Sequence, residues 1–174
     1  MTGKTFLNRV ANGQTDAVSL LLNLLKQTGA DYCVIGGLAV NAYAEPVVSL
    51  DLDLVVITDK VQALCKAAST RGAKIERFEH SINLTVPGSD LRVQLQTDPR
   101  YQEFIGRAEQ RNVLGYTMAV AALEDVLAGK VWAYRDPQRR KSKRQKDLAD
   151  ILRMVEAHPE IKGRLPPEIE SQAD

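Results

Sequence analysis

Two adjacent glycines, Gly36 and Gly37, directly follow a short β-prone run at residues 32–35 and precede a segment at 38–43 that can form a short helix. Because glycine has no Cβ, such a pair lets the backbone approach a ligand closely. It also leaves free N–H groups that can bind an anion such as a phosphate. The junction therefore predicts a strand, a glycine turn and a helix, as in α/β proteins.

Two aspartates follow fourteen residues after the second glycine. Asp51 and Asp53 alternate with Leu50, Leu52 and Leu54, which is the pattern of a strand with one buried face. Carboxylates at positions i and i+2 of a strand point from the same face, about 6 to 7 Å apart at the backbone. Their oxygens can therefore converge on one divalent cation such as Mg²⁺, which also bridges nucleotide phosphates in metal-assisted phosphoryl transfer.

Each half of this pattern also has a purely structural interpretation. An alternating strand with one solvated face is common, and on its own it would explain Asp51 and Asp53. A glycine pair alone is commonly a simple tight turn. The occurrence of both features in one order is what favours a binding site.

The rest of the chain alternates between helical and β-prone patterns. The expected helices span residues 17–27, 60–71, 119–134 and 142–157, and the expected strands span 49–57 and 112–116, with an antiparallel meander at 74–78, 82–86 and 91–96. We expect four regions: a flexible N-terminal segment (1–16), a core (17–117), a C-terminal helical pair packed on the core (118–157) and a frayed tail (158–174).

Composition excludes several classes of protein. The chain has 174 residues, of which 44% are hydrophobic and 26% charged, so we expect one folded domain rather than a disordered chain. It has two cysteines and two histidines without metal-type spacing, which argues against a zinc site and leaves a hard cation held by carboxylates. No signal peptide or membrane span is visible, so we expect a cytoplasmic protein with no membrane partner.

Charge is unevenly distributed along the chain. Residues 130–146 contain eight basic residues and one acid, although the net charge of the whole chain is +1. Such a segment is typical of a surface that attracts a polyanion, and RNA or tRNA is a candidate partner. A solvated linker without a specific partner explains the run equally well.

The glycine pair and the Asp-x-Asp pair together resemble the signature of the nucleotidyltransferase superfamily with the DNA polymerase β-like fold. The downstream pattern is similar to that of AbiEii-type and minimal nucleotidyltransferases, which include toxins of toxin–antitoxin systems. The residues that carry this second similarity are Lys130, Ala133, Arg135, Lys146, Asp147 and Asp150. Together the two resemblances cover about residues 17–155.

The resemblance implies an α+β (α/β) fold, with a short mixed β-sheet flanked by helices and a C-terminal helical pair. It implies that Asp51 and Asp53 are catalytic and hold Mg²⁺ or Mn²⁺, and that Gly36 and Gly37 bind the triphosphate of an NTP. The implied reaction transfers a nucleoside monophosphate to a hydroxyl and releases pyrophosphate. Further nucleotide-binding candidates are Ser49, Lys130, Arg135 and Lys146.

The resemblance also implies a third carboxylate on a later strand, where this chain has Gln94 and Gln96. A glutamine binds metal weakly and cannot act as a base. An alternative hypothesis is therefore a catalytically degenerate member of the fold, which binds RNA or protein or acts in a toxin–antitoxin pair with an antitoxin-like protein. A plain α/β interaction protein is a third hypothesis.

Overall fold

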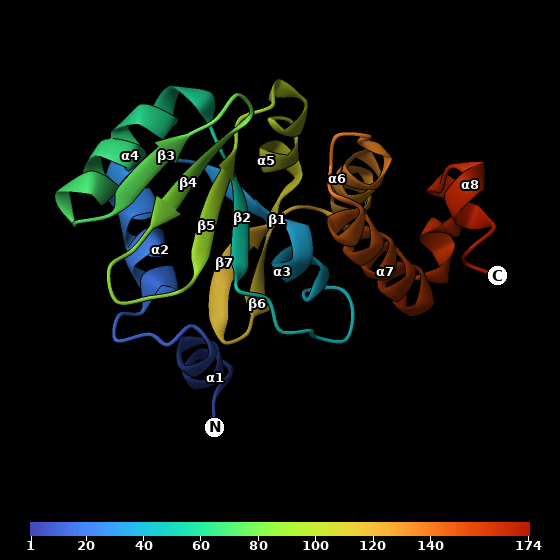
Figure 1. The fold of residues 1–174 in the computed structure, drawn as a ribbon, viewed down its shortest axis with the longest axis horizontal. Helices are drawn as coiled ribbons and strands as arrows, with labels where there is room; N and C mark the ends of the chain where they lie inside the picture. Colours follow the sequence, from blue (N-terminus) through green and yellow to red (C-terminus); the bar gives the residue numbers. More distant parts are fainter.

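The computed structural model describes residues 1–174, and its centre is one seven-stranded mixed sheet (Figure 1). The strands are β1 (Tyr32–Ile35), β2 (Asp51–Val56), β3 (Lys74–Arg77), β4 (Ser81–Thr85), β5 (Arg92–Gln96), β6 (Glu109–Val113) and β7 (Tyr116–Val120). Their order in the sheet is β3-β4-β5-β2-β1-β7-β6. The pairs β2–β5 and β1–β7 are parallel and the others are antiparallel, so the β3-β4-β5 meander is confirmed.

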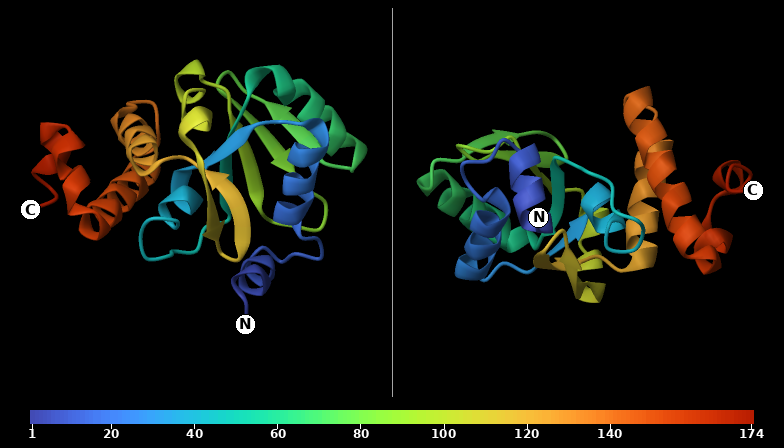
Figure 2. Two further views of the ribbon diagram at one scale, coloured as in Figure 1. Left: turned by 180° about the vertical axis from the view of Figure 1, so that it is seen from behind. Right: turned by 90° about the horizontal axis from the view of Figure 1, so that it is seen from below.

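Helices lie on both sides of this sheet. They are α1 (Gly3–Val10), α2 (Ala17–Thr28), α3 (Gly36–Val40), α4 (Val61–Thr70), α5 (Phe104–Arg107), α6 (Leu123–Arg135), α7 (Lys141–Ala157) and α8 (Pro167–Glu170), with 3₁₀ turns η1 (Thr58–Lys60), η2 (Pro99–Tyr101) and η3 (Pro159–Arg164). Apolar residues of α2 and α4 meet those of β4 and β5. On the other side, α3 contacts α6 and α7, which stand beside the sheet with α8 beyond them (Figure 2). None of these helices is long and apolar enough to cross a bilayer.

Alternation along β2 decides which of its side chains face α3, α6 and α7 and which face the apolar core. Leu52 and Leu54 are each 1% exposed in the core, whereas Asp51 and Asp53 point from the opposite face. A half-buried strand has this pattern because successive side chains point to opposite faces. The alternation predicted for this strand is therefore confirmed, and it turns both carboxylates towards α3, α6 and α7.

The expectation of a helix at residues 119–134 was wrong at its start. Residues 116–120 form β7, which pairs with β6 in a hairpin, and α6 begins only at Leu123. Alanines in this run favoured a helix in the sequence, but Tyr116, Met118 and Val120 alternate into the core and are at most 2% exposed. The strand expected at 112–116 in fact crosses the hairpin turn.

The two ends of the chain contain more structure than we expected. The N-terminal segment contains α1, which Thr2 caps, and Leu7 is buried. The segment after α1 is held by backbone hydrogen bonds from Asp90 N to the Ala11 carbonyl and from Gln14 N to the Gly88 carbonyl. In the tail, three apolar residues are buried: Ile161 of η3, Leu165 directly after it and Ile169 of α8. Short amphipathic segments of this kind are stabilised by tertiary contacts rather than by their own helical propensity.

Two connections tie α7 to the segment between the glycine turn and β2. An Nη1 group of Arg153 donates to the Glu45 carbonyl at 2.5 Å, and His158 Nε2 lies 2.8 Å from the Tyr43 carbonyl. Both contacts bridge more than 100 residues of sequence. The C-terminal helices are therefore fixed to the loop that joins the two halves of the candidate site.

The cap of α2 allows a direct test of the local structure. Asp16 Oδ1 accepts from Ser19 N at 3.0 Å and from the Tyr116 hydroxyl at 2.9 Å. Burial raises the pKa of the Asp16 carboxyl, but the hydrogen bonds from Ser19 and Tyr116 together outweigh it, so the pKa is lowered overall. We expect Asp16→Ala to lower the free energy of unfolding by about 1 to 2 kcal/mol at pH 7, as measured by urea unfolding.

The pH dependence of this effect has a definite sign. Because the folded-state pKa of Asp16 lies below the unfolded value of about 3.9, its contribution is complete above that pH and is lost as the pH falls through the folded pKa. The difference between wild type and Asp16→Ala should therefore shrink below about pH 4. The exposed Asp31 caps no helix, and Asp31→Ala is the control. An equal loss in both variants would contradict the capping role.

Candidate active site

The glycine turn lies directly against one of the two aspartates. β1 ends at Ile35 and α3 begins at Gly36, whose φ of 72° is in the left-handed region that favours glycine. A Cβ at this position would overlap Asp53 Oδ2. At Gly37, a Cβ would lie 3.8 Å from both Ser49 Oγ and Asp150 Oδ2. The first glycine is therefore required both by backbone conformation and by its contact with the carboxylate.

The register of the central strands places both aspartates beside β5. Asp51 is opposite Arg92, and Asp53 is opposite Gln94 and, on the other side, Ile35. Asp51 Oδ1 accepts from Arg92 Nε at 2.6 Å. Asp51 Oδ2 lies 3.7 Å from Lys143 Nζ of α7. The Asp51 carboxylate thus lies between a cation from the sheet and a cation from the helical pair.

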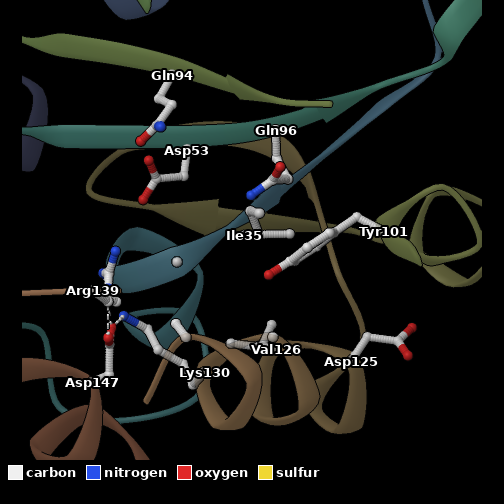
Figure 3. Close-up of a pocket in the computed structure, with 13 residues that line it drawn as sticks. Ile35, Asp53, Gln94, Gln96, Tyr101, Asp125, Val126, Lys130, Arg139 and Asp147 are labelled. Carbon is white, nitrogen blue, oxygen red and sulfur yellow. Dashed lines mark hydrogen bonds and ion pairs between the residues drawn. The ribbon is translucent and has the colours of Figure 1, made fainter. Parts of the chain in front are cut away.

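Asp53 lines a cavity of about 130 Å³ between the sheet and α6 (Figure 3). Gln94 and Gln96 project into it from β5, and the Tyr101 side chain lies at one end, while Lys130 approaches from α6. Burial raises the pKa of Asp53 to about 6, with Lys130 acting in the opposite direction and Asp51 adding to the rise. An approaching cation would reverse this shift, because it favours the charged carboxylate.

A buried ion network forms the wall of this cavity on the side of the helical pair. Lys130 Nζ lies 3.1 Å from Asp147 Oδ1 and 2.7 Å from Asp150 Oδ2. Arg139 Nε donates to Asp147 Oδ2 at 2.6 Å, and Arg153 donates to Asp150 Oδ1 at 2.8 Å. The side chains of both aspartates are at most 6% exposed, and ions so deeply buried require partners of this kind.

The structure brings together most of the residues that the sequence singled out. Gly36, Asp53 and Lys130 line the cavity. Asp51 stands two residues before Asp53 on β2 and does not line the cavity, and buried Ser49 accepts a hydrogen bond from the backbone N–H of Asp51 at 3.2 Å. Ser49 therefore shapes the start of β2 in this structure.

Two predicted nucleotide-binding residues lie away from the cavity. Arg135 pairs with Glu168 of α8 at 3.2 Å, at the far end of α6. Lys146 is exposed on α7, whereas its neighbour Asp147 is 1% exposed. Successive residues of a helix point about 100° apart, so Lys146 and Asp147 cannot face the same cavity.

Sequence reasoning missed several side chains of the site. Arg92, Tyr101, Arg139 and Lys143 were not candidates, although the last two belong to the basic segment that the sequence did identify. Arg92 lies two residues before Gln94, and only the parallel β2–β5 register reveals that it faces Asp51. Trp132 stacks on Phe104 at 5.7 Å between ring centroids and so packs against another aromatic side chain.

The two carboxylates are compatible with a divalent cation whose remaining ligands are water molecules or substrate oxygens. Asp51 and Asp53 supply carboxylate oxygens from one face, but no group of three or more Asp, Glu, His or Cys side chains converges at any place in the chain. Mg²⁺ in proteins is commonly held by one or two carboxylates together with water and substrate phosphates. The two aspartates therefore fit a cation that is shared with a bound nucleotide.

No protein-family model matches the sequence, and no curated protein does. Solved structures match its fold. The lincosamide antibiotic adenylyltransferase LnuA, bound to lincomycin, has a TM-score of 0.57 and 12% identity over 82% of this chain and 99% of that chain. ANT(2")-Ia in complex with adenylyl-2"-tobramycin has a TM-score of 0.58 and 15% identity over 91% and 97% of the two chains.

A third similar structure is an antigenic nucleotidyltransferase-like protein from Paracoccidioides brasiliensis. Its TM-score is 0.52, with 22% identity over 95% of this chain and 84% of that chain. Each of the three similarities covers more than four fifths of this chain. The chain therefore has the fold of the nucleotidyltransferase superfamily, which its glycine turn and paired aspartates predicted.

Proposed function

We propose that the protein binds an NTP together with Mg²⁺ or Mn²⁺ and transfers a nucleoside monophosphate to a hydroxyl acceptor. The observation that carries this proposal is the direct contact between the glycine turn and Asp53 at the edge of a cavity that also contains Lys130. This arrangement puts a backbone that can approach phosphates beside a carboxylate that can share a cation with them.

Each group then has a distinct task. Gly36 and Gly37 admit the triphosphate close to the backbone, while Lys130 and Arg139 neutralise its charge from the other side of the cavity. Asp51 and Asp53 would hold the divalent cation, which polarises the phosphoryl group when it is bound. Because the cavity walls already fix Lys130 and Arg139 in ion pairs, these cations need little reorganisation when the phosphates arrive.

At the α-phosphorus the reaction forms one bond and breaks one, and the acceptor hydroxyl loses its proton. The oxygen of the acceptor hydroxyl attacks the α-phosphorus, and the bond from that phosphorus to the oxygen bridging the α- and β-phosphates breaks. Pyrophosphate leaves with the electron pair of that bond. Gln94, which faces Asp53, cannot accept the hydroxyl proton because its amide is not a base, so the proton passes to water.

A small molecule is the acceptor class that the observations favour. LnuA binds lincomycin, ANT(2")-Ia carries adenylyl-2"-tobramycin, and this chain matches nearly the whole length of both. The basic segment, in contrast, is partly neutralised by carboxylates of the chain itself. Its residues with intramolecular partners are Lys130, Arg135, Arg139, Lys143 and Arg144. Four of its eight charges therefore face carboxylates of the chain, since the partner of Arg144 is the neutral Tyr134 carbonyl, and fewer remain for RNA.

A labelling experiment tests the transfer and identifies the acceptor class together. The protein is incubated with Mg²⁺, each NTP labelled with ³²P at the α-phosphate, and separate fractions of small molecules, RNA and protein. We expect label to move into the small-molecule fraction and to be absent when Asp51→Asn/Asp53→Asn replaces the wild type. Label in the RNA or protein fraction would overturn the small-molecule acceptor but not the transfer.

Binding without transfer is the second candidate function. Two observations favour it: Gln94 stands opposite Asp53, and Asp51 is already paired with Arg92. A binding-only protein, such as a component of a toxin–antitoxin pair with an antitoxin-like partner, would be stabilised by Mg²⁺ and nucleotide but would release no pyrophosphate. If the protein binds nucleotide but transfers label to none of the fractions, the result supports binding without transfer.

A further inference from the structure

The surroundings of the two aspartates carry more positive than negative charge. Apart from Asp125, which also lines the cavity and is paired with Arg107, four carboxylates lie around the glycine turn, and five cationic side chains pair with them or line the same cavity. The carboxylates are Asp51, Asp53, Asp147 and Asp150, and the cations are Arg92, Lys130, Arg139, Lys143 and Arg153. The excess of positive charge therefore repels a divalent cation that arrives alone, whereas it attracts a polyphosphate.

The sheet adds no further negative charge directly beside the two aspartates. Beyond Asp51, the same row of the sheet continues with Arg92 of β5 and Thr85 of β4. Beyond Asp53 it continues with Gln94 and Asn83. All four of these neighbours are neutral or cationic. The next carboxylate in these rows is Glu76 on the outer strand β3, where it pairs with Lys74, so no other carboxylate lies directly beside the two aspartates.

Arg92 holds Asp51 through one nitrogen only. Its Nε donates to Asp51 Oδ1 at 2.6 Å, and its two Nη groups have no hydrogen-bond partner in the chain. The Arg92 side chain is 69% exposed, whereas that of Asp51 is 23% exposed. An exposed ion pair of this kind is weak and exchanges partners at little cost. A guanidinium with free Nη groups is suited to bind a phosphate through two parallel hydrogen bonds.

We infer that this site binds a polyphosphate without metal but binds a divalent cation only when a polyphosphate is present. Arg92 is the residue that makes cation binding depend on the polyphosphate. In the free protein Arg92 neutralises Asp51. When a polyphosphate arrives, Arg92 turns to its oxygens, and Asp51 becomes available to a cation that the phosphates also hold. The two ligands are then thermodynamically coupled, each raising the affinity of the site for the other.

This inference deepens the proposed function and rests on it, since both require phosphates at the glycine turn. Arg92 acts through Asp51 and is therefore a positioning residue. Its test needs measurements that a merely structural role would not change. Inorganic tripolyphosphate, which carries no base, and Mn²⁺ alone serve as separate probes.

The experiment compares wild type with Arg92→Gln and with the control Arg71→Gln, which removes the same charge from an exposed position at the end of α4. Calorimetry measures the Kd of tripolyphosphate in EDTA, and electron paramagnetic resonance measures bound Mn²⁺. In wild type and the control we expect tripolyphosphate to bind without metal, and Mn²⁺ to bind only after tripolyphosphate has been added.

In Arg92→Gln we expect the metal-free Kd of tripolyphosphate to rise about tenfold, the equivalent of about 1.4 kcal/mol. Mn²⁺ alone should bind this variant at least about tenfold more tightly than wild type, since Asp51 has lost the nearer of its two cationic neighbours and keeps only Lys143 at 3.7 Å. Equal binding of Mn²⁺ alone by wild type and Arg92→Gln would overturn the inference, as would a tripolyphosphate affinity that does not depend on Arg92. If the coupling is found but no NTP is transferred, the proposed reaction fails and the inference stands.

Discussion

Wild-type protein with Mg²⁺ and its preferred NTP should unfold at a clearly higher temperature than protein with either ligand alone. A ligand present at 100 times its Kd adds about 2.7 kcal/mol to the free energy of unfolding. For a chain of this size that corresponds to a rise of roughly 5 to 10 °C in Tm. Thermal unfolding with ATP, GTP, CTP and UTP in turn, with and without Mg²⁺, measures the effect and the base preference.

The Asp51→Asn/Asp53→Asn variant should lose the Mg²⁺-dependent part of this rise completely. Its fold should survive, because both side chains point away from the apolar core and the buried Lys130 keeps Asp147 and Asp150 as partners. Asp59→Asn, at an exposed position of η1, is the matched control and should respond as wild type does. An unchanged Mg²⁺-dependent shift in the double variant would refute the assignment of both aspartates.

Replacement of Lys130 should have the largest effect on stability. Lys130→Met removes the cation that lies between Asp147 and Asp150 and leaves buried carboxylates with fewer partners. Breaking a buried pair in this way commonly costs about 3 to 5 kcal/mol. We expect a value near the lower limit, because Arg139 and Arg153 continue to hold the two aspartates. Urea unfolding of the two proteins measures the difference.

Lys146→Met provides the comparison for this experiment. Lys146 lies on the exposed face of α7 and makes no ion pair, so its replacement should change the free energy of unfolding by less than about 0.5 kcal/mol. Equal costs for the two replacements would show that the buried network does not stabilise the fold. The pair also tests the site, since only Lys130 lines the cavity. Nucleotide affinity should fall in Lys130→Met alone.

Local patterns in the sequence were sufficient for most of the elements. The helix predicted at residues 17–27 is present as α2, with Asp16 as its N-cap and Gly29 as its C-cap. The β6–β7 hairpin was not predicted, because its second strand contains Met118, Ala119 and Val120, which are equally compatible with a helix. Pairing with β1 decided between the two structures, and such long-range pairing is invisible in a local window.

The site residues that lie close together in the sequence were predicted, and those that lie far apart in the sequence were missed. Gly36, Asp51 and Asp53 stand near each other and form a recognisable pattern. Arg92 and Tyr101 reach the site only through the register of β5 and the position of η2, and neither carries a signal in the sequence. On α7, the inward direction of Asp147 and the outward direction of Lys146 depend on which face of the helix meets α6.

The alternation of β2 has a consequence for how this chain can change in evolution. A slip of one residue in β2 would turn both aspartates into the apolar core and expose Leu52 and Leu54 to solvent. Any insertion or deletion within the strand would therefore be eliminated for failure to fold before its effect on chemistry mattered. Selection for a stable fold therefore also preserves the spacing of the two carboxylates. This spacing can persist in descendants that have lost every activity.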